Sequence, residues 1–146
     1  MRKNKNKKIL EVFKRVDEAG DSKTLADVLR EAGDPKTSAD VLRELVKNNK
    51  DWRVKEIIAG NPNTPPEVLE ELAEDENVRY VVAGNPNTPA DTLKKLAKDK
   101  DWKIRMIVAV NPSTSEETLK ELTKDEYWRV RMAAWYNRVK RKLHKE

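Results

Sequence analysis

The chain has 146 residues, of which 39% are charged and 5% are aromatic, with a net charge of +5 and no cysteine. The lack of cysteine excludes a disulfide framework and thiolate chemistry, and no apolar run approaches the length needed to cross a membrane. The start, M-R-K-N-K-N-K-K, has no apolar secretion-signal core, so we expect a soluble cytoplasmic protein with one domain over 1–146.

The charge is concentrated at the two ends. Residues 1–8 hold five Lys/Arg and no acid, and residues 137–146 hold five Lys/Arg and one acid, which leaves 9–136 at −4. Basic ends attract nucleic acid or acidic partners. The alternative is that they only solubilise the termini.

The first predicted element is a helix over 9–20, ended by Gly20, whose apolar face is Ile9, Leu10, Phe13 and Val16. A tandem follows: E-A-G-D-S-K-T-L-A-D-V-L-R-E-A from Glu18, and E-A-G-D-P-K-T-S-A-D-V-L-R-E-L from Glu31. We interpret it as two helices of the same type, here called A, with no second helix type between them. Residues 1–32 would then be capping helices that close the N-terminal end of a repeat array.

Four related units are predicted over 33–134. Their prolines, spaced 27, 24 and 26 residues apart, are Pro35, Pro62, Pro86 and Pro112. A period in this range is typical of stacked repeat proteins. Each proline precedes a leucine pair at i, i+3, which is one face of helix A: Leu42/Leu45, Leu69/Leu72, Leu93/Leu96 and Leu119/Leu122.

Each helix A is preceded by a capping-box pattern. Thr64 is followed three residues later by Glu67, and the same spacing occurs in the other units, at Thr24/Asp27, Thr37/Asp40, Thr88/Asp91 and Thr114/Glu117. The pattern predicts that each threonine caps helix A. It also places Pro65 and Pro89 at the first helical position, where a missing N–H costs nothing.

A second helix, B, follows in each unit. Its apolar positions recur at i, i+3, i+4: Val54/Ile57/Ile58, Val78/Val81/Val82, Ile104/Ile107/Val108 and Val130/Ala133/Ala134. The spacing leaves open whether helix B is α or 3₁₀. Gly60 and Gly84, each followed by Asn-Pro, would end it.

The motif degrades after the fourth unit. Trp135, Tyr136, Asn137 and Arg138 stand where Ala-Gly-Asn-Pro is expected, so helix B can continue through Val139 and Leu143. We expect residues 135–146 to form a C-terminal cap and basic tail, with Trp135 and Tyr136 covering the last core face.

The motif N-P-x-T-P-x-x-L-x-x-L-A-x-D followed by V-R-x-x-V-A resembles the leucine-rich repeat variant family, an α-solenoid related to HEAT and armadillo repeats. The resemblance is specific over 60–134 and looser over 33–59. It implies an all-α, right-handed superhelix of two-helix repeats of about 24–27 residues, with α-helices outside and short, often 3₁₀, helices on the inner face. Some family members carry an iron–sulfur cluster on N-terminal cysteines, which this chain lacks, so no cofactor is expected.

The patterned surface feature is a ridge of cations on either side of the first apolar residue of helix B. Its members are Arg53, Lys55, Arg79, Lys103, Arg105, Arg129 and Arg131. They would bind phosphate backbone or an acidic peptide. Alternatively, they pair with aspartates between repeats, at Asp51, Asp75, Asp101 and Asp125.

Two other residue sets recur in register. Trp52, Trp102 and Trp128 precede helix B and either pack across the loop between the helices or stack on bases or a peptide. Asn61, Asn85 and Asn111 recur at one turn position. They would form a structural ladder that satisfies turn backbone, with a ligand site as the alternative.

No catalytic or metal-ligand set is recognisable in the sequence. His144 is the only histidine, and the serines lie in turns and caps without a base nearby. We therefore expect no enzyme, no metal site and a monomeric scaffold that binds a protein or peptide segment in its inner groove. Two alternatives stay open: sequence-independent binding of nucleic-acid backbone, and an idealised or engineered repeat protein without a native ligand.

Overall fold

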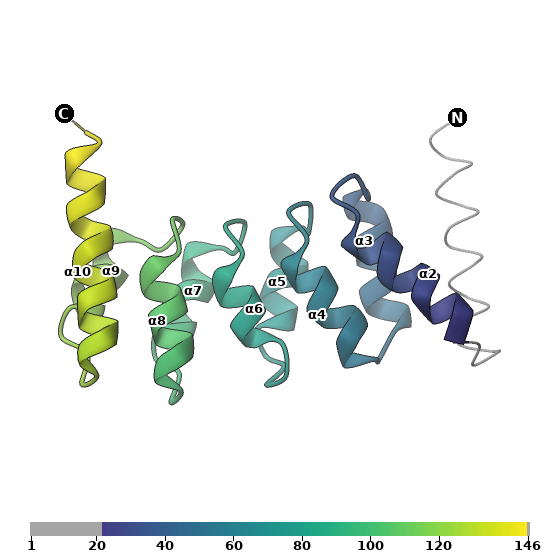
Figure 1. Ribbon diagram of the computed structural model, residues 1–146, viewed down its shortest axis with the longest axis horizontal. Helices are drawn as coiled ribbons and strands as arrows, with labels where there is room; N and C mark the ends of the chain where they lie inside the picture. Colours follow the sequence, from purple (N-terminus) through teal and green to yellow (C-terminus); the bar gives the residue numbers. More distant parts are fainter. Residues whose placement is uncertain (1–21, 146) are drawn as a thin grey trace.

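The structure is a computed structural model that describes residues 22–145; the helix predicted over 9–20 and the basic residues 1–8 lie outside the described residues. Its helices lie side by side along the long axis of the molecule (Figure 1). The described part is all-helical, as predicted, and consists of stacked two-helix repeats. No described helix is both long enough and apolar enough to span a lipid bilayer.

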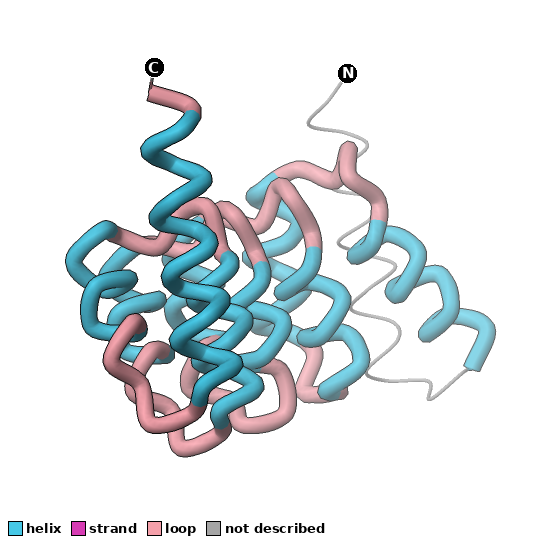
Figure 2. Tube along the Cα trace, turned by 60° about the vertical axis from the view of Figure 1, so that its left-hand side comes forward, coloured by secondary structure: helices cyan, strands magenta, loops and turns pink. Residues whose placement is uncertain are grey.

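The A helices are α3 (Ala39–Asn48), α5 (Pro66–Leu72), α7 (Ala90–Leu96) and α9 (Glu116–Leu122). The B helices of the same repeats are α4 (Trp52–Gly60), α6 (Arg79–Gly84), α8 (Trp102–Val110) and α10 (Trp128–Leu143). All four B helices are α-helical. Successive B helices pack directly on one another, and loops join them to the A helices (Figure 2).

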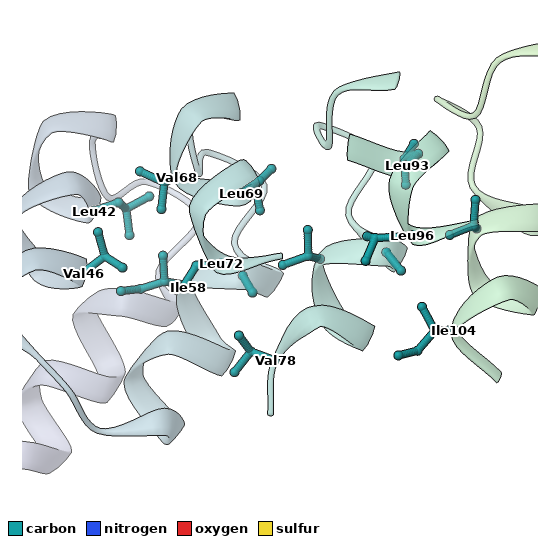
Figure 3. Close-up of a cluster of buried hydrophobic side chains, with 14 of the residues drawn as sticks. Leu42, Val46, Ile58, Val68, Leu69, Leu72, Val78, Leu93, Leu96 and Ile104 are labelled. Atoms are coloured by element: carbon teal, nitrogen blue, oxygen red, sulfur yellow. The ribbon is translucent and has the colours of Figure 1, made fainter. Parts of the chain in front are cut away.

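The hydrophobic core runs without interruption between the row of A helices and the row of B helices. Both leucines of every A-helix pair are buried, and so are the first and third apolar residues of every B-helix triplet. Figure 3 shows how Leu69 and Leu72 of α5 lie between residues of the neighbouring repeats, such as Leu42 and Leu93. Each repeat therefore completes its core with its neighbours, as expected for a solenoid.

The interpretation of residues 18–45 as two A helices in succession is wrong. The first of them is α2 (Ser22–Gly33), which packs on α4 and therefore begins the B row. The end of α2 also has the hydrogen bonds found at the end of a B helix. Asn61 Nδ2 donates to the carbonyls of Ala32 and Asp34 at the end of α2. In the same way, Asn85 Nδ2 donates to the carbonyls of Ala59 and Asn61 at the end of α4. The shared A-D-V-L-R pattern suits both roles. What separates them is the Gly33-Asp34-Pro35 turn, which α2 has and α3 lacks.

The predicted threonine caps are also wrong. The hydroxyls of Thr37, Thr64, Thr88 and Thr114 donate backward to the carbonyl six residues earlier, near the end of the preceding B helix. The capping residue is the next one along: Ser38, Pro65, Pro89 or Ser115. The prolines thus stand one residue before the helix, and Thr24 lies inside α2. Each threonine is needed to close the turn, so it is not available to the helix after it.

Candidate interaction surface

The predicted cation ridge divides into two rows with different surroundings. Lys55, Arg79 and Arg105 cross to the next repeat and pair with aspartates at 3.2, 2.9 and 2.7 Å. Their partners are Asp75, Asp99 and Asp125. Two of the predicted aspartates are therefore confirmed as partners. The other two, Asp51 and Asp101, instead cap α4 and α8 through the backbone N–H of Arg53 and Lys103.

The three pairs become more buried along the array. Side-chain exposures of Lys55 and Asp75 are 27% and 23%, whereas those of Arg105 and Asp125 are 9% and 8%. Arg105 donates to both carboxylate oxygens of Asp125, and its Nη1 donates to the carbonyls of Asp99 and Lys100. The Arg79 pair is close but less well aligned, because Nε does not point at its carboxylate as a donor.

These contacts shift the ionisation of the carboxylates. Burial favours a raised pKa at Asp125, but hydrogen bonds from Arg105 and from the backbone of Tyr127 outweigh it and hold that pKa below its ordinary value. The pKa of Asp75 is lowered first by the backbone N–H of Asn77 and then by Lys55. Three of the predicted ridge cations are therefore engaged inside the protein.

The second row consists of Arg53, Lys103 and Arg129, which lie one residue before the apolar position. Arg53 pairs with Asp51 of its own turn at 2.6 Å and stays exposed. Arg129 lies over two indole rings, 5.7 Å from the centre of Trp102 and 5.4 Å from that of Trp128, as in a cation–π contact. Lys103 is exposed.

The tryptophans do not share one environment. Trp102 is partly buried against Tyr127, with ring centres 4.3 Å apart, which fits the packing interpretation. Trp52 and Trp128 are 53% and 55% exposed. Packing across the loop therefore accounts for Trp102 only.

Sequence reasoning missed a third row, two residues after the first apolar residue of each B helix. It holds Glu56, Tyr80, Met106 and Met132. Tyr80 and Met132 are 43% and 56% exposed, and the Tyr80 hydroxyl donates to Glu56. These positions could have been found in the sequence, because they recur with the period of the repeats. We call the exposed side of the B helices, which carries Trp52, Tyr80, Trp128 and Met132, the B-face.

The asparagines form a ladder. Asn61, Asn85 and Asn111 are buried, and each Nδ2 donates to two carbonyls of the repeat before it. Each Oδ1 accepts the backbone N–H two residues on. Since both ends of each amide are occupied, the ladder is structural and is not a ligand site. Asn137 continues the ladder with hydrogen bonds to the carbonyls of Ala109 and Asn111, although it lies within α10 and not in a turn.

Trp135 and Tyr136 do not cover the core, contrary to expectation. They are 56% and 64% exposed, and the buried residues of α10 are Val130 and Ala134. Arg138 and Arg141 anchor the end of the helix instead, through Glu116 and through the carbonyls of Asn111 and Pro112. In residues 22–145 no group of three or more His, Asp or Glu is placed to hold a metal ion.

Comparison with known families supports the resemblance seen in the sequence. Residues 26–79, which run from α2 to the start of α6, match the family model of the Leucine Rich Repeat Variant domain. No curated protein and no solved structure matches the chain. The predicted resemblance to this repeat family is thereby confirmed.

Proposed function

We propose that this leucine-rich-repeat-variant stack is a non-enzymatic binding module that holds a segment of another protein along its B-face. The observation that carries the proposal is the contrast between the cations and the aromatic residues of the B helices. Lys55, Arg79 and Arg105 are neutralised across repeat boundaries, whereas Trp52, Tyr80, Trp128 and Met132 remain exposed.

The chemistry of the B-face favours a protein partner. Aromatic residues and methionine are enriched in protein interfaces, and Trp and Tyr are frequent hot spots. They come from α4, α6 and α10, so a bound segment would run across several repeats. The B helices also pack more closely on one another than the A helices do, as expected for the inner side of a curved stack.

Nucleic acid is the second candidate, and the pairing argues against it. A phosphate backbone binder needs cations that can release counterions. Of the ridge, Lys55, Arg79 and Arg105 already hold carboxylates across repeat boundaries, and Arg53 holds one within its own turn.

The test is a selection of random 12-residue peptides on the full chain, followed by measurement of Kd from tryptophan emission. We expect enriched peptides whose Kd rises tenfold or more in Trp52→Ala or Tyr80→Ala, since hot-spot truncation has effects of this size. Lys124→Ala, an exposed change in the loop after α9, should leave Kd unchanged.

Two results would overturn the proposal. One is the absence of any enriched peptide, which would favour a repeat scaffold without a ligand. The other is binding of a random 20-base-pair duplex that weakens when Lys103 and Arg129 become glutamine. Its salt slope should then fall by about 0.9 for each phosphate that the protein no longer neutralises.

A further inference from the structure

The last B helix, α10, carries an arginine in the same setting as Arg105 but without the carboxylate. Nη1 of Arg105 donates to the carbonyls of Asp99 and Lys100 at 2.7 and 3.1 Å. Nη1 of Arg131 donates to the equivalent carbonyls, those of Asp125 and Glu126, at 2.8 and 3.0 Å. The two guanidinium groups are therefore held by the same backbone clamp.

The rest of the guanidinium differs between the two sites. Arg105 uses Nε and Nη2 to grip Asp125 of the next repeat. Arg131 is exposed, and among the residues the structure describes it forms no ion pair with a carboxylate. A fixed, two-pronged donor of this kind matches the geometry of a carboxylate.

The residue four positions after this cation also differs between α10 and the other B helices. Ala59, Ala83 and Ala109 are fully buried, but the equivalent Trp135 is 56% exposed. Arg131 and Trp135 share a helix face with Lys142, at i, i+4 and i+11. We call these three residues the end face. No helix among residues 22–145 lies beyond α10 in the B row (Figure 1).

We propose that the end face docks an acidic α-helix of another protein, whose carboxylate takes the place at Arg131 that Asp125 has at Arg105. The contact continues the interface by which each repeat receives the next. Because tryptophan replaces the usual alanine, the docked helix should present small residues opposite Trp135.

Charge selects the acidic helix over a second copy of this chain. Residues 128–143 contain six Lys/Arg and no Asp or Glu, so pairing of two α10 helices would bring like charges together. Head-to-tail stacking would place the first A helix on Arg131. That helix carries Asn48 at the position of Asp75, Asp99 and Asp125, which lies three residues after the second leucine.

The test uses a displayed library of 20-residue, alanine-rich helical peptides with polar positions randomised among Asp, Glu, Lys and Ser. Enriched peptides should share one acidic position. Their Kd for the full chain should rise about tenfold or more in Arg131→Gln, the usual effect of losing a charged hydrogen-bond partner. Arg131→Lys should lose part of the affinity, and Trp135→Ala should weaken binding similarly.

Matched controls separate this site from the B-face. Lys124→Gln removes the same charge from an exposed loop and should leave Kd unchanged. Trp52→Ala should impair the 12-residue B-face peptides and not the acidic helices, so each proposal can fail alone. Melting curves would verify that Arg131→Gln is folded, and Trp135→Ala changes a side chain that is already exposed.

Any one of three results from the library would overturn the proposal. The library yields no binder, or the binders lack a shared acid, or their Kd is unchanged in both Arg131→Gln and Trp135→Ala. A dimer in sedimentation equilibrium at 100 µM that Trp135→Ala dissociates would also overturn it, in favour of a second copy.

Discussion

Arg105 of α8 holds both carboxylate oxygens of Asp125, which lies just after α9 in the next repeat, with Nε 2.7 Å from Oδ2 and Nη2 3.1 Å from Oδ1. The equivalent Lys55–Asp75 pair joins the first two repeats at 3.2 Å, with both side chains more exposed. Ion pairs at equivalent positions therefore join successive repeats, but their side chains are buried to different degrees.

This difference predicts unequal costs for removing the carboxylates. Asp125→Asn removes the buried counter-charge of Arg105 and leaves only the exposed Glu126, 3.6 Å away, so we expect a loss of about 3 kcal/mol in the free energy of unfolding. Asp75→Asn should cost less than about 1 kcal/mol, because partly exposed pairs are screened by solvent. Urea unfolding of both variants measures this difference. Equal losses would show that burial does not set the strength of the pairs.

The same carboxylates predict acid destabilisation. Asp75, Glu116 and Asp125 all have pKa values below their ordinary values in the folded protein; the hydrogen bond from Arg138 is the largest cause at Glu116. A lowered folded-state pKa contributes stability that is fully present above the unfolded-state pKa, about 4, and is lost as the pH falls through the folded-state value.

We therefore expect the free energy of unfolding to decline below about pH 4. The stability of Asp125→Asn should decline less steeply, because one of the carboxylates with a lowered pKa no longer titrates. Urea unfolding from pH 2.5 to 7 tests this. Parallel profiles for the two proteins would mean that Asp125 does not contribute.

The asparagine ladder predicts a large effect from one small change. Asn85→Ala removes the donor to the carbonyls of Ala59 and Asn61 and leaves polar backbone groups buried, which should cost about 2–3 kcal/mol. Asn87→Ala is the matched control, because Asn87 is exposed and its side chain donates to the carbonyl of Pro62. The control should be nearly neutral by thermal melting. A comparable loss in both would assign the effect to the turn as a whole.

The B helices also predict a compensating pair of substitutions. A Cβ at Gly84 would lie 3.5 Å from Cγ2 of Ile107, an ordinary contact, so Gly84→Ala should be tolerated. Gly84→Val adds bulk at this crossing and should cost about 1–3 kcal/mol. The next repeat has valine and alanine at the equivalent positions, Val110 and Ala133.

The double variant Gly84→Val, Ile107→Ala should therefore recover stability relative to the sum of the single changes. A coupling of about 1 kcal/mol in a double-mutant cycle would support this register. Additive losses would contradict it.

Much of the fold follows from periodicity alone. Leu69 and Leu72 are buried because an i, i+3 pair defines one side of a helix, and the repeat period assigns their counterparts. The role of α2 did not follow, because its sequence nearly duplicates that of α3 and only the turn after it distinguishes the two. Thr64 was misplaced for a related reason: its hydroxyl can serve either flanking helix, and the turn backbone decides which.

The surface was the less predictable part. Lys55 and Arg53 are both cations beside the same apolar residue, yet one reaches the next repeat and the other returns to its own turn. Their spacing places the two side chains on nearly opposite sides of the helix, but it does not tell which side faces an aspartate of the next repeat. Trp135 was expected to cover the core, but its equivalents in the earlier repeats, such as Ala109, are buried inside the stack, whereas no described helix lies beyond α10 to cover Trp135.

The same asparagine hydrogen bond joins each repeat described here to the one before it. The donors are Asn61, Asn85, Asn111 and Asn137. An array whose repeats contact only their neighbours behaves as a one-dimensional lattice. Its length can then be edited: duplicating residues 85–110 should insert a repeat in register and sharpen the melting transition. Removing a central asparagine hydrogen bond should instead divide the single melting transition into two.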